Sequence, residues 1–264
     1  MHAFAPRDSD GVDFDWSRTS EDYARHRAGY PERFYRFLAA LGVGRPGQRV
    51  LDLATGTGIV ARALAARGCR VCGVDVAPGQ IDAAKQLAAE QGLTLDLRIA
   101  SAEETGYEGR SFDAITASQC WPYFERDRAV REVRRLLDAG GLLATSHLSW
   151  LPRLDPIAAA SEALVLEHHP GWSAGGWSGE VPVPVDWAGE DFDLVGHFVF
   201  DEPIEYTREG WRGRFRACRG VGASLAPGAV RAFDEAHAAL LERIAPEQFT
   251  ILHRIDAHVL APRA

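Results

Sequence analysis

The stretch VLDLATGTGIVARAL, residues 50–64, joins a short apolar run to a glycine-rich turn and then to a segment with helical periodicity. Gly56, Gly58 and Ala61 satisfy the pattern G-x-G-x-x-[GA], in which glycines let the backbone turn tightly and let a ligand approach the start of a helix. Asp75 ends the next apolar run, where a carboxylate accepts hydrogen bonds from ribose hydroxyls. The stretch therefore predicts a site for a cofactor that carries a nucleoside.

The segments around this turn predict an α/β fold. Strand-like apolar runs alternate with helical patterns; the runs cover residues 49–54, 70–76, 93–100, 112–118 and 142–148, and the helical patterns cover residues 59–67, 78–91 and 126–138. This alternation implies right-handed crossovers and a parallel sheet covered on both faces. We therefore predict a doubly wound, mostly parallel, Rossmann-like sheet of about seven strands, completed by the runs at 193–200 and 249–260.

The alternation breaks after residue 150, and this break suggests a helical cap on the core. Residues 170–190 are rich in Gly, Pro and Trp, which is typical of a loop, and helical patterns lie at 156–169, 207–217 and 228–244. Two short helices, interrupted at Gly29–Pro31, are expected within residues 20–41. The expected parts are an N-terminal arm or lid at 1–41, a cofactor-binding core at 42–150, cap insertions at 151–192 and 203–248, and final core strands at 193–202 and 249–264.

The composition of the chain limits which partners the protein can bind. The chain has 264 residues and a net charge of −8, the wrong sign for a protein that binds nucleic acid through its phosphates. No apolar run approaches the roughly 20 residues of a membrane helix. The four cysteines are expected to be free thiols, and no compact His/Asp/Glu ligand set predicts a metal. We expect a cytoplasmic monomer or homodimer that acts on a small molecule, without nucleic-acid or membrane partners.

A second acid distinguishes among the possible cofactors. Asp52 lies inside the first strand-like run, whereas a strand that leads to a dinucleotide is normally apolar up to its glycines. A carboxylate there suits a ligand that carries an ammonium group. With Asp75 and the run S-A-E at 101–103, this pattern resembles class I S-adenosylmethionine-dependent methyltransferases. Residues 22–31, DYARHRAGYP, also resemble the arm Y-x-x-x-R-x-x-Y-P of the members that act on small molecules, so the resemblance covers about residues 20–150.

The resemblance implies a role for particular residues toward S-adenosylmethionine. It places Ala54, Gly56 and Gly58 against the methionine part, Asp75 on the ribose, Val76 and Gln80 near the adenine, Ser101, Ala102 and Glu103 beside the adenine, Gln119 at the methionine side, and Tyr23 and Arg27 over the carboxylate end. Two positions depart from the family pattern. Ser101 stands where relatives often carry Asp, which passes recognition of the adenine amino group to Glu103 or to backbone, and Pro122–Tyr123 stand where relatives often carry His-Trp.

The expected reaction is in-line displacement of a methyl group onto a small-molecule acceptor, with oxygen or nitrogen favoured over carbon. His147 is a candidate base because it lies at the carboxyl end of the fifth strand, where doubly wound sheets bind ligands. His168 is a second candidate, and both histidines also fit a packing role. Two alternatives stay open: a nicotinamide-dependent oxidoreductase, and a non-catalytic protein of the same fold that binds S-adenosylmethionine.

Overall fold

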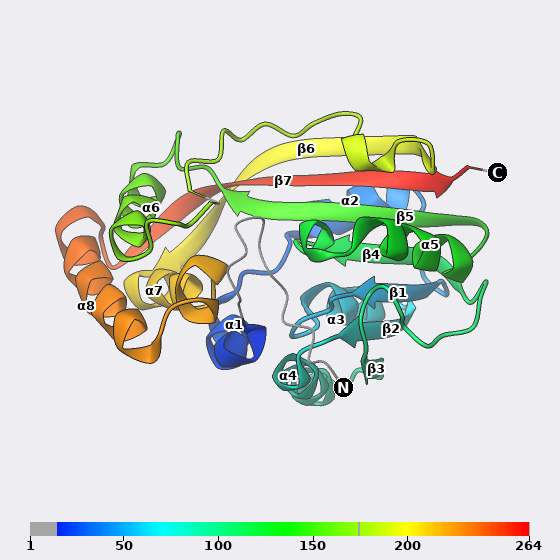
Figure 1. Ribbon diagram of the computed structural model, residues 1–264, viewed down its shortest axis with the longest axis horizontal. Helices are drawn as coiled ribbons and strands as arrows, with labels where there is room; N and C mark the ends of the chain where they lie inside the picture. Colours follow the sequence, from blue (N-terminus) through cyan, green and yellow to red (C-terminus); the bar gives the residue numbers. More distant parts are fainter. Residues whose placement is uncertain (1–14, 174, 264) are drawn as a thin grey trace. The chain divides into compact units, whose positions relative to one another are not determined.

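The computed structural model describes residues 15–173 and 175–263. Seven strands form one sheet in the order β3-β2-β1-β4-β5-β7-β6 (Figure 1). Neighbouring strands from β3 to β5 pair in parallel, and β7 points opposite to β5 and β6. The strands are β1 (Arg49–Leu53), β2 (Arg70–Asp75), β3 (Asp96–Ile99), β4 (Phe112–Ser118), β5 (Leu137–Trp150), β6 (Phe192–Thr207) and β7 (Gln248–Pro262). The predicted mostly parallel seven-stranded sheet is confirmed.

The helices follow the sequence pattern closely. The interruption at Gly29–Pro31 separates two helices as predicted, and Pro31 is the N-cap of the second. The helices are α1 (Ser20–His26), α2 (Glu32–Ala40), α3 (Ile59–Ala66), α4 (Pro78–Glu90), α5 (Arg126–Leu136), α6 (Pro156–His168), α7 (Arg208–Arg216) and α8 (Pro227–Ile244). None of the helices in the described residues is both long and apolar enough to cross a membrane.

Four strands differ from the predicted runs by several residues: β3 begins at Asp96 rather than at residue 93, and β5, β6 and β7 are longer than predicted. β5 begins at Leu137, because Leu137 pairs with Phe112 before the register shifts and Ala114 pairs with Leu142. The residues between bulge out, and Gly140 supplies the left-handed backbone with a φ of 77°. β6 and β7 extend beyond the runs at 193–200 and 249–260. β6 continues through Pro203, because β6 is an edge strand, where a proline need not interrupt the ladder.

The strand order creates a topological switch point between β1 and β4. Chain connections lead from β1 to β2 and β3 on one side, and from β4 to β5 on the other. Parallel sheets of this kind bind ligands at the carboxyl ends of the strands beside the switch point. The loops after Leu53 of β1 and Ser118 of β4 are therefore the expected location of a site.

The chain divides into two compact units, a core unit and a helical unit. The core unit comprises Gly29–Leu148, Val181–Phe200 and the residues from Ile255 onward. The helical unit comprises the described residues up to Ala28, together with Ser149–Glu180 and Asp201–Arg254.

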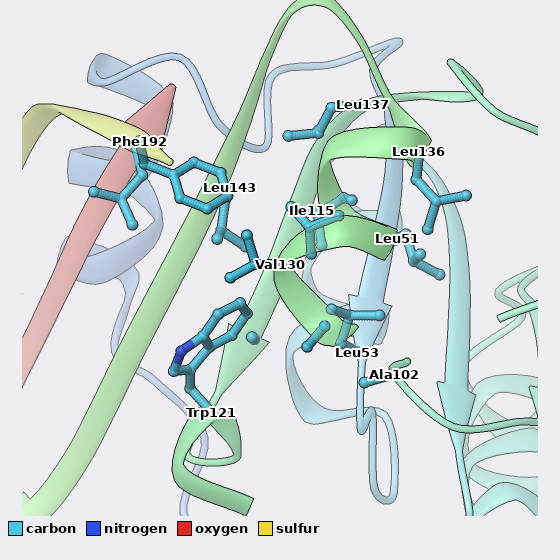
Figure 2. Close-up of a cluster of buried hydrophobic side chains, with 14 of the residues drawn as sticks. Leu51, Leu53, Ala102, Ile115, Trp121, Val130, Leu136, Leu137, Leu143 and Phe192 are labelled. Carbon is cyan, nitrogen blue, oxygen red and sulfur yellow. The ribbon is translucent and has the colours of Figure 1, made fainter. Parts of the chain in front are cut away.

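The core unit is stabilised by apolar side chains between the sheet and α5 (Figure 2). Leu51 and Ile115 come from β1 and β4, and they lie in one cluster with Val130 and Leu136 of α5. The buried positions of α5 recur at helical spacing, so one face of this otherwise charged helix is apolar. Trp121, which follows β4, closes the cluster and packs on Trp187 with ring centroids 4.2 Å apart. This packing fixes the carboxyl ends of β1 and β4.

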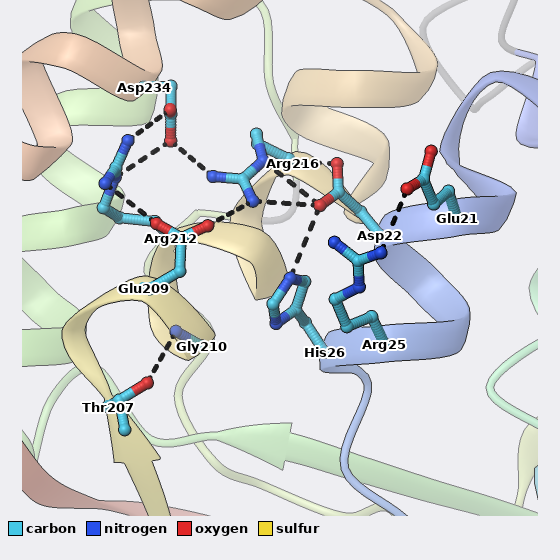
Figure 3. A network of polar contacts seen from close by, with 10 residues as sticks. All are labelled: Glu21, Asp22, Arg25, His26, Thr207, Glu209, Gly210, Arg212, Arg216 and Asp234. Atoms are coloured by element: carbon cyan, nitrogen blue, oxygen red, sulfur yellow. Dashed lines mark hydrogen bonds and ion pairs between the residues drawn. The ribbon is translucent and has the colours of Figure 1, made fainter.

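The helical unit holds α1 against α7 through a network of ion pairs (Figure 3). Arg216 of α7 is bonded to Asp22 of α1, Asp234 of α8 and Glu209 of its own helix. At the same interface a Cβ added to Gly213 would lie 2.1 Å from the His26 ring, so only glycine allows this approach. The arm residues of α1 therefore belong to a defined packing arrangement in this unit.

Candidate active site

The loop after β1 has a left-handed backbone at three positions. Ala54, Gly56 and Gly58 have φ values of 47°, 57° and 77°. Glycine adopts this conformation readily, whereas alanine pays about 1 kcal/mol or more, and such strain concentrates at functional sites. A Cβ on Gly58 would also lie 3.4 Å from that of Ala84 in α4. The loop thus brings its backbone to the start of α3 in the tight turn that the sequence predicted.

Asp75 ties this turn to the end of β2. Its carboxylate accepts hydrogen bonds from the backbone N–H groups of Gly56 and Ala77, each at 2.9 Å. Burial raises the pKa of Asp75, whose exposed fraction is 8%. Each carboxylate oxygen has a second lone pair, so Asp75 can hold the loop and still accept from two neighbouring ribose hydroxyls. Its expected cofactor role fits this geometry.

Asp52 is a buried carboxylate between β1 and β4. It accepts hydrogen bonds from the Thr55 hydroxyl at 2.7 Å and from the Thr116 hydroxyl of β4 at 2.6 Å. Burial raises its pKa to about 6, and the charge of Asp75 adds to the increase. In the described part of the chain no Lys, Arg or His forms an ion pair with Asp52. A cationic ligand would relieve this concentration of negative charge, so the site fits the ammonium and sulfonium groups of S-adenosylmethionine.

A second strained residue lies across the switch point at the end of β4. Gln119 has a φ of 65°. Its backbone N–H donates to the Ser146 carbonyl at 2.8 Å, and its side-chain Nε2 donates to the Leu148 carbonyl at 2.6 Å. Both donors therefore bind to β5, and the side-chain oxygen is the group left to accept from a ligand. Gln119 and Ala54 thus place strained backbone at the ends of two adjacent strands.

Apolar side chains at the ends of β2 and β3 offer a surface for an adenine ring. Val76 and Ile99 are 44% and 59% exposed, and Ile99 is in register with Asp75. Ala102 is buried nearby in the sequence, and Gln80 is buried in the first turn of α4. Ile99 was not predicted from the sequence, although its place as an apolar residue at the end of the third strand could have indicated a contact with adenine.

Ser101 and Glu103 lie in the turn beyond β3. Ser101 forms an isolated bridge with Glu104. Glu103 Oε1 accepts from the N–H of Glu125, the N-cap of α5, at 2.8 Å. One oxygen of Glu103 is therefore engaged in positioning α5, and the other is available for the expected contact with an adenine amino group.

His147 forms a pair with a buried carboxylate that the sequence argument missed. Its Nδ1 lies 3.0 Å from Oδ1 of Asp256 on β7, the neighbour of β5. Asp256 is 1% exposed, whereas the His147 side chain is 38% exposed. A carboxylate at Nδ1 favours the tautomer whose Nε2 accepts a proton. The pair has the arrangement of a general base, and no sequence signal linked two residues so far apart.

Three predicted site residues belong to the helical unit. The Arg27 guanidinium lies over the Tyr23 ring, 5.4 Å from its centroid. His168, the last residue of α6, contacts the Phe233 ring edge-on at 5.7 Å. The contact of His168 favours packing, and the roles of Tyr23 and Arg27 toward the cofactor stay predictions. The four cysteines are free, and no group of three or more potential ligands gathers as a metal site within residues 15–173 and 175–263.

The buried Asp52 predicts a pH-dependent stability. Between its ordinary pKa of 3.8 and about 6, the folded protein holds a proton that the unfolded chain has lost. The free energy of unfolding therefore falls by about 3 kcal/mol as pH rises through this window, and the penalty is constant above it. The variant Asp52→Asn is expected to be more stable than wild type near neutral pH and to bind S-adenosylhomocysteine more weakly. Denaturant unfolding from about pH 4 to pH 8 measures the difference, and a difference that does not change with pH would refute the assignment.

The turn after β1, the two acids and the switch point of the sheet together form the candidate cofactor site. Residues 51–145 match the sequence model of a methyltransferase domain. Over this segment the chain is therefore similar to known methyltransferase domains.

Relatives with curated names match about half of the chain. An uncharacterized methyltransferase from Mycobacterium tuberculosis is 33% identical over 141 residues, which are 51% of this chain and 55% of the relative. A ubiquinone biosynthesis O-methyltransferase from Xanthomonas campestris is 34% identical over 115 residues, which are 43% of this chain and 48% of the relative. The chain thus spans about half the length of the curated relatives it matches.

Solved structures share the fold over most of the chain. A protein from Anaeromyxobacter dehalogenans, described as a candidate type II methyltransferase, aligns with a TM-score of 0.61 at 22% identity and covers 90% of this chain and 97% of its own. Phosphoethanolamine N-methyltransferase 2 from Haemonchus contortus, solved with phosphomonomethylethanolamine and S-adenosylhomocysteine, aligns with a TM-score of 0.53 at 17% identity and covers 94% of this chain and 58% of its own. At these identities the likeness shows the fold.

Proposed function

We propose that the protein transfers the methyl group of S-adenosylmethionine to a small-molecule acceptor by in-line displacement. The observation that carries this proposal is the pair Asp52 and Asp75, two buried carboxylates around a strained turn, with no basic side chain paired to either in the described residues. S-adenosylmethionine is a cation that brings ribose hydroxyls, an ammonium group and an electrophilic methyl group. A nicotinamide dinucleotide carries a pyrophosphate, which two negative charges beside the turn would repel.

The chain's own residues would perform two tasks in this reaction. Asp75 would accept from the ribose, and the turn from Ala54 to Gly58 would fix the ligand against β1, so that binding orients the reactants. The apolar cluster around Trp121 would limit the access of water.

His147 and Asp256 favour a hydroxyl acceptor over an amine. A hydroxyl must lose a proton as it attacks, whereas an amine needs only to arrive neutral. Nε2 of His147 would accept that proton, and Asp256 would hold the ring and stabilise the charge that forms. Some of the relatives are named ubiquinone biosynthesis O-methyltransferases, and this name also favours an oxygen acceptor. We further propose a cytoplasmic location, supported by four free cysteines and a net charge of −8.

The proposal is tested by incubating the protein with methyl-labelled S-adenosylmethionine and a panel of small phenols, alcohols and amines. Label is expected in the oxygen-methylated product of a phenol or alcohol. Cofactor binding without transfer to any acceptor or cell extract would instead support the non-catalytic alternative. Transfer to amines alone would refute the role of His147 as a base.

A further inference from the structure

Arg214 of α7 is a buried cation without a counter-charge. It is 4% exposed, and its guanidinium carbon lies 4.7 Å from the centroid of the Trp150 ring. Nε and Nη1 are buried and find no hydrogen-bond partner among the described residues, and no carboxylate there forms an ion pair with it. Arg212 and Arg216 on the same helix, by contrast, both pair with Asp234 and Glu209 (Figure 3). In α7, therefore, Arg212 and Arg216 form ion pairs with acids, whereas Arg214 forms no ion pair with the described residues.

The titratable groups that act most on Arg214 are Arg27, Tyr206, Cys218 and Tyr23, and none of these is a carboxylate. The Tyr206 hydroxyl of β6 lies close enough to interact with Arg214, yet it is buried without a well-formed hydrogen bond. Burial lowers the pKa of Arg214 to about 10, and the charge of Arg27 contributes to the decrease. Burial also lowers the pKa of His253 on β7 to about 3, and Arg214 and Arg27 act on it in the same direction. All of these residues belong to the helical unit, and no acid balances them in its described part.

An arrangement of this kind costs stability unless an anion completes it. A buried charge without a partner is strongly unfavourable, and buried arginines are normally paired with carboxylates. A guanidinium presents its N–H groups as a planar fork that matches a carboxylate or a phosphate, and a neighbouring tyrosine hydroxyl adds one more donor. The unused donors of Arg214 and Tyr206 are therefore those that an oxyanion requires.

We propose that Arg214, together with Tyr206, binds a carboxylate or phosphate group of the methyl acceptor. The assignment to the acceptor rests on the proposed function and on the position of Arg214 in the sequence. Arg214 lies outside residues 51–145, the segment that matches the methyltransferase domain. It is therefore not part of the cofactor pattern that this segment shares with other methyltransferases. The acceptor is therefore an anionic small molecule.

The first test compares thermal unfolding of the variants in chloride buffer without ligands. Arg214→Met keeps an unbranched chain against Trp150 and removes the unpaired charge. We expect its melting temperature to equal or exceed that of wild type, whereas a structural arginine would lose several degrees. Arg231→Met, at an exposed position of α8, is the matched control and should leave stability unchanged. A large loss of stability in Arg214→Met alone would overturn the proposal.

The second test uses inorganic phosphate and citrate as probes at constant ionic strength. Both anions are expected to raise the melting temperature of wild type and of Arg231→Met, and to lose this effect in Arg214→Met. Tyr206→Phe keeps the charge and should retain only part of the effect, so it gives a second, independent test of the site. An equal anion effect in all four proteins would refute the site.

Calorimetry with S-adenosylhomocysteine separates the acceptor from the cofactor. We expect Arg214→Met to bind it within a few fold of wild type. A loss of tenfold or more would mean that Arg214 holds the cofactor's carboxylate, and it would overturn the assignment to the acceptor. If wild type binds no S-adenosylhomocysteine but keeps its response to phosphate, the proposed function fails and the anion site stands.

Discussion

The variant Asp75→Ala is expected to bind S-adenosylhomocysteine more weakly by about 2–4 kcal/mol, or roughly 30- to 1000-fold in Kd. The loss has two physical sources. The substitution removes the charged acceptor for two ribose hydroxyls, and it releases the N–H of Gly56, so the turn is no longer held to β2. Titration calorimetry with S-adenosylhomocysteine measures the effect.

Asp96→Ala is the matched control for this experiment. Asp96 is a carboxylate of β3 in the same sheet, but it forms a half-exposed ion pair with Arg98. Such pairs contribute little, so the affinity for the cofactor and the stability should both stay close to those of wild type. If Asp75→Ala and Asp96→Ala bind equally well, Asp75 does not contact the ribose.

The variant His147→Ala is expected to lose about 10²–10⁴-fold in turnover on a hydroxyl acceptor, while its affinity for the cofactor changes by no more than a few fold. The reason is that no base would be in position to take the proton that the hydroxyl loses as it attacks the methyl group. Asp256→Asn removes the charge that orients His147, and it should lower turnover by about tenfold or more. Initial rates at saturating cofactor measure both effects, and calorimetry with S-adenosylhomocysteine shows that cofactor binding is kept.

His197→Ala is the control for the histidine variants. His197 is an exposed residue of β6, and its ring stacks on His258. It should keep the turnover of wild type. Treatment of wild type with a chelator should also leave turnover unchanged, because the proposed base needs no metal. Full turnover in His147→Ala would return this residue to a packing role.

The sequence was sufficient for those features that local rules determine. The turn from Ala54 to Gly58 and the acid Asp75 follow from one βαβ unit, where the spacing of glycines and strand ends is set by the chain itself. The strain at Gln119 was not predictable, because it depends on hydrogen bonds to β5 that form only when the sheet assembles.

Other features of the site depend on pairing between distant parts of the chain. Asp256 contacts His147 because β7 lies next to β5 in the sheet. No local sequence pattern predicts that these two strands are neighbours. Arg214 is one of several arginines in α7, and the sequence pattern does not separate it from the others. Only the burial of its Nε and Nη1 without partners, beside two paired arginines, separates it from them.

Calorimetric titration of wild-type protein with S-adenosylhomocysteine and, separately, with a reduced nicotinamide dinucleotide tests the central claim most directly. The buried acids Asp52 and Asp75 predict that S-adenosylhomocysteine binds with one site per chain and that the dinucleotide releases no binding heat. Binding of the dinucleotide without binding of S-adenosylhomocysteine would contradict the assignment of this site.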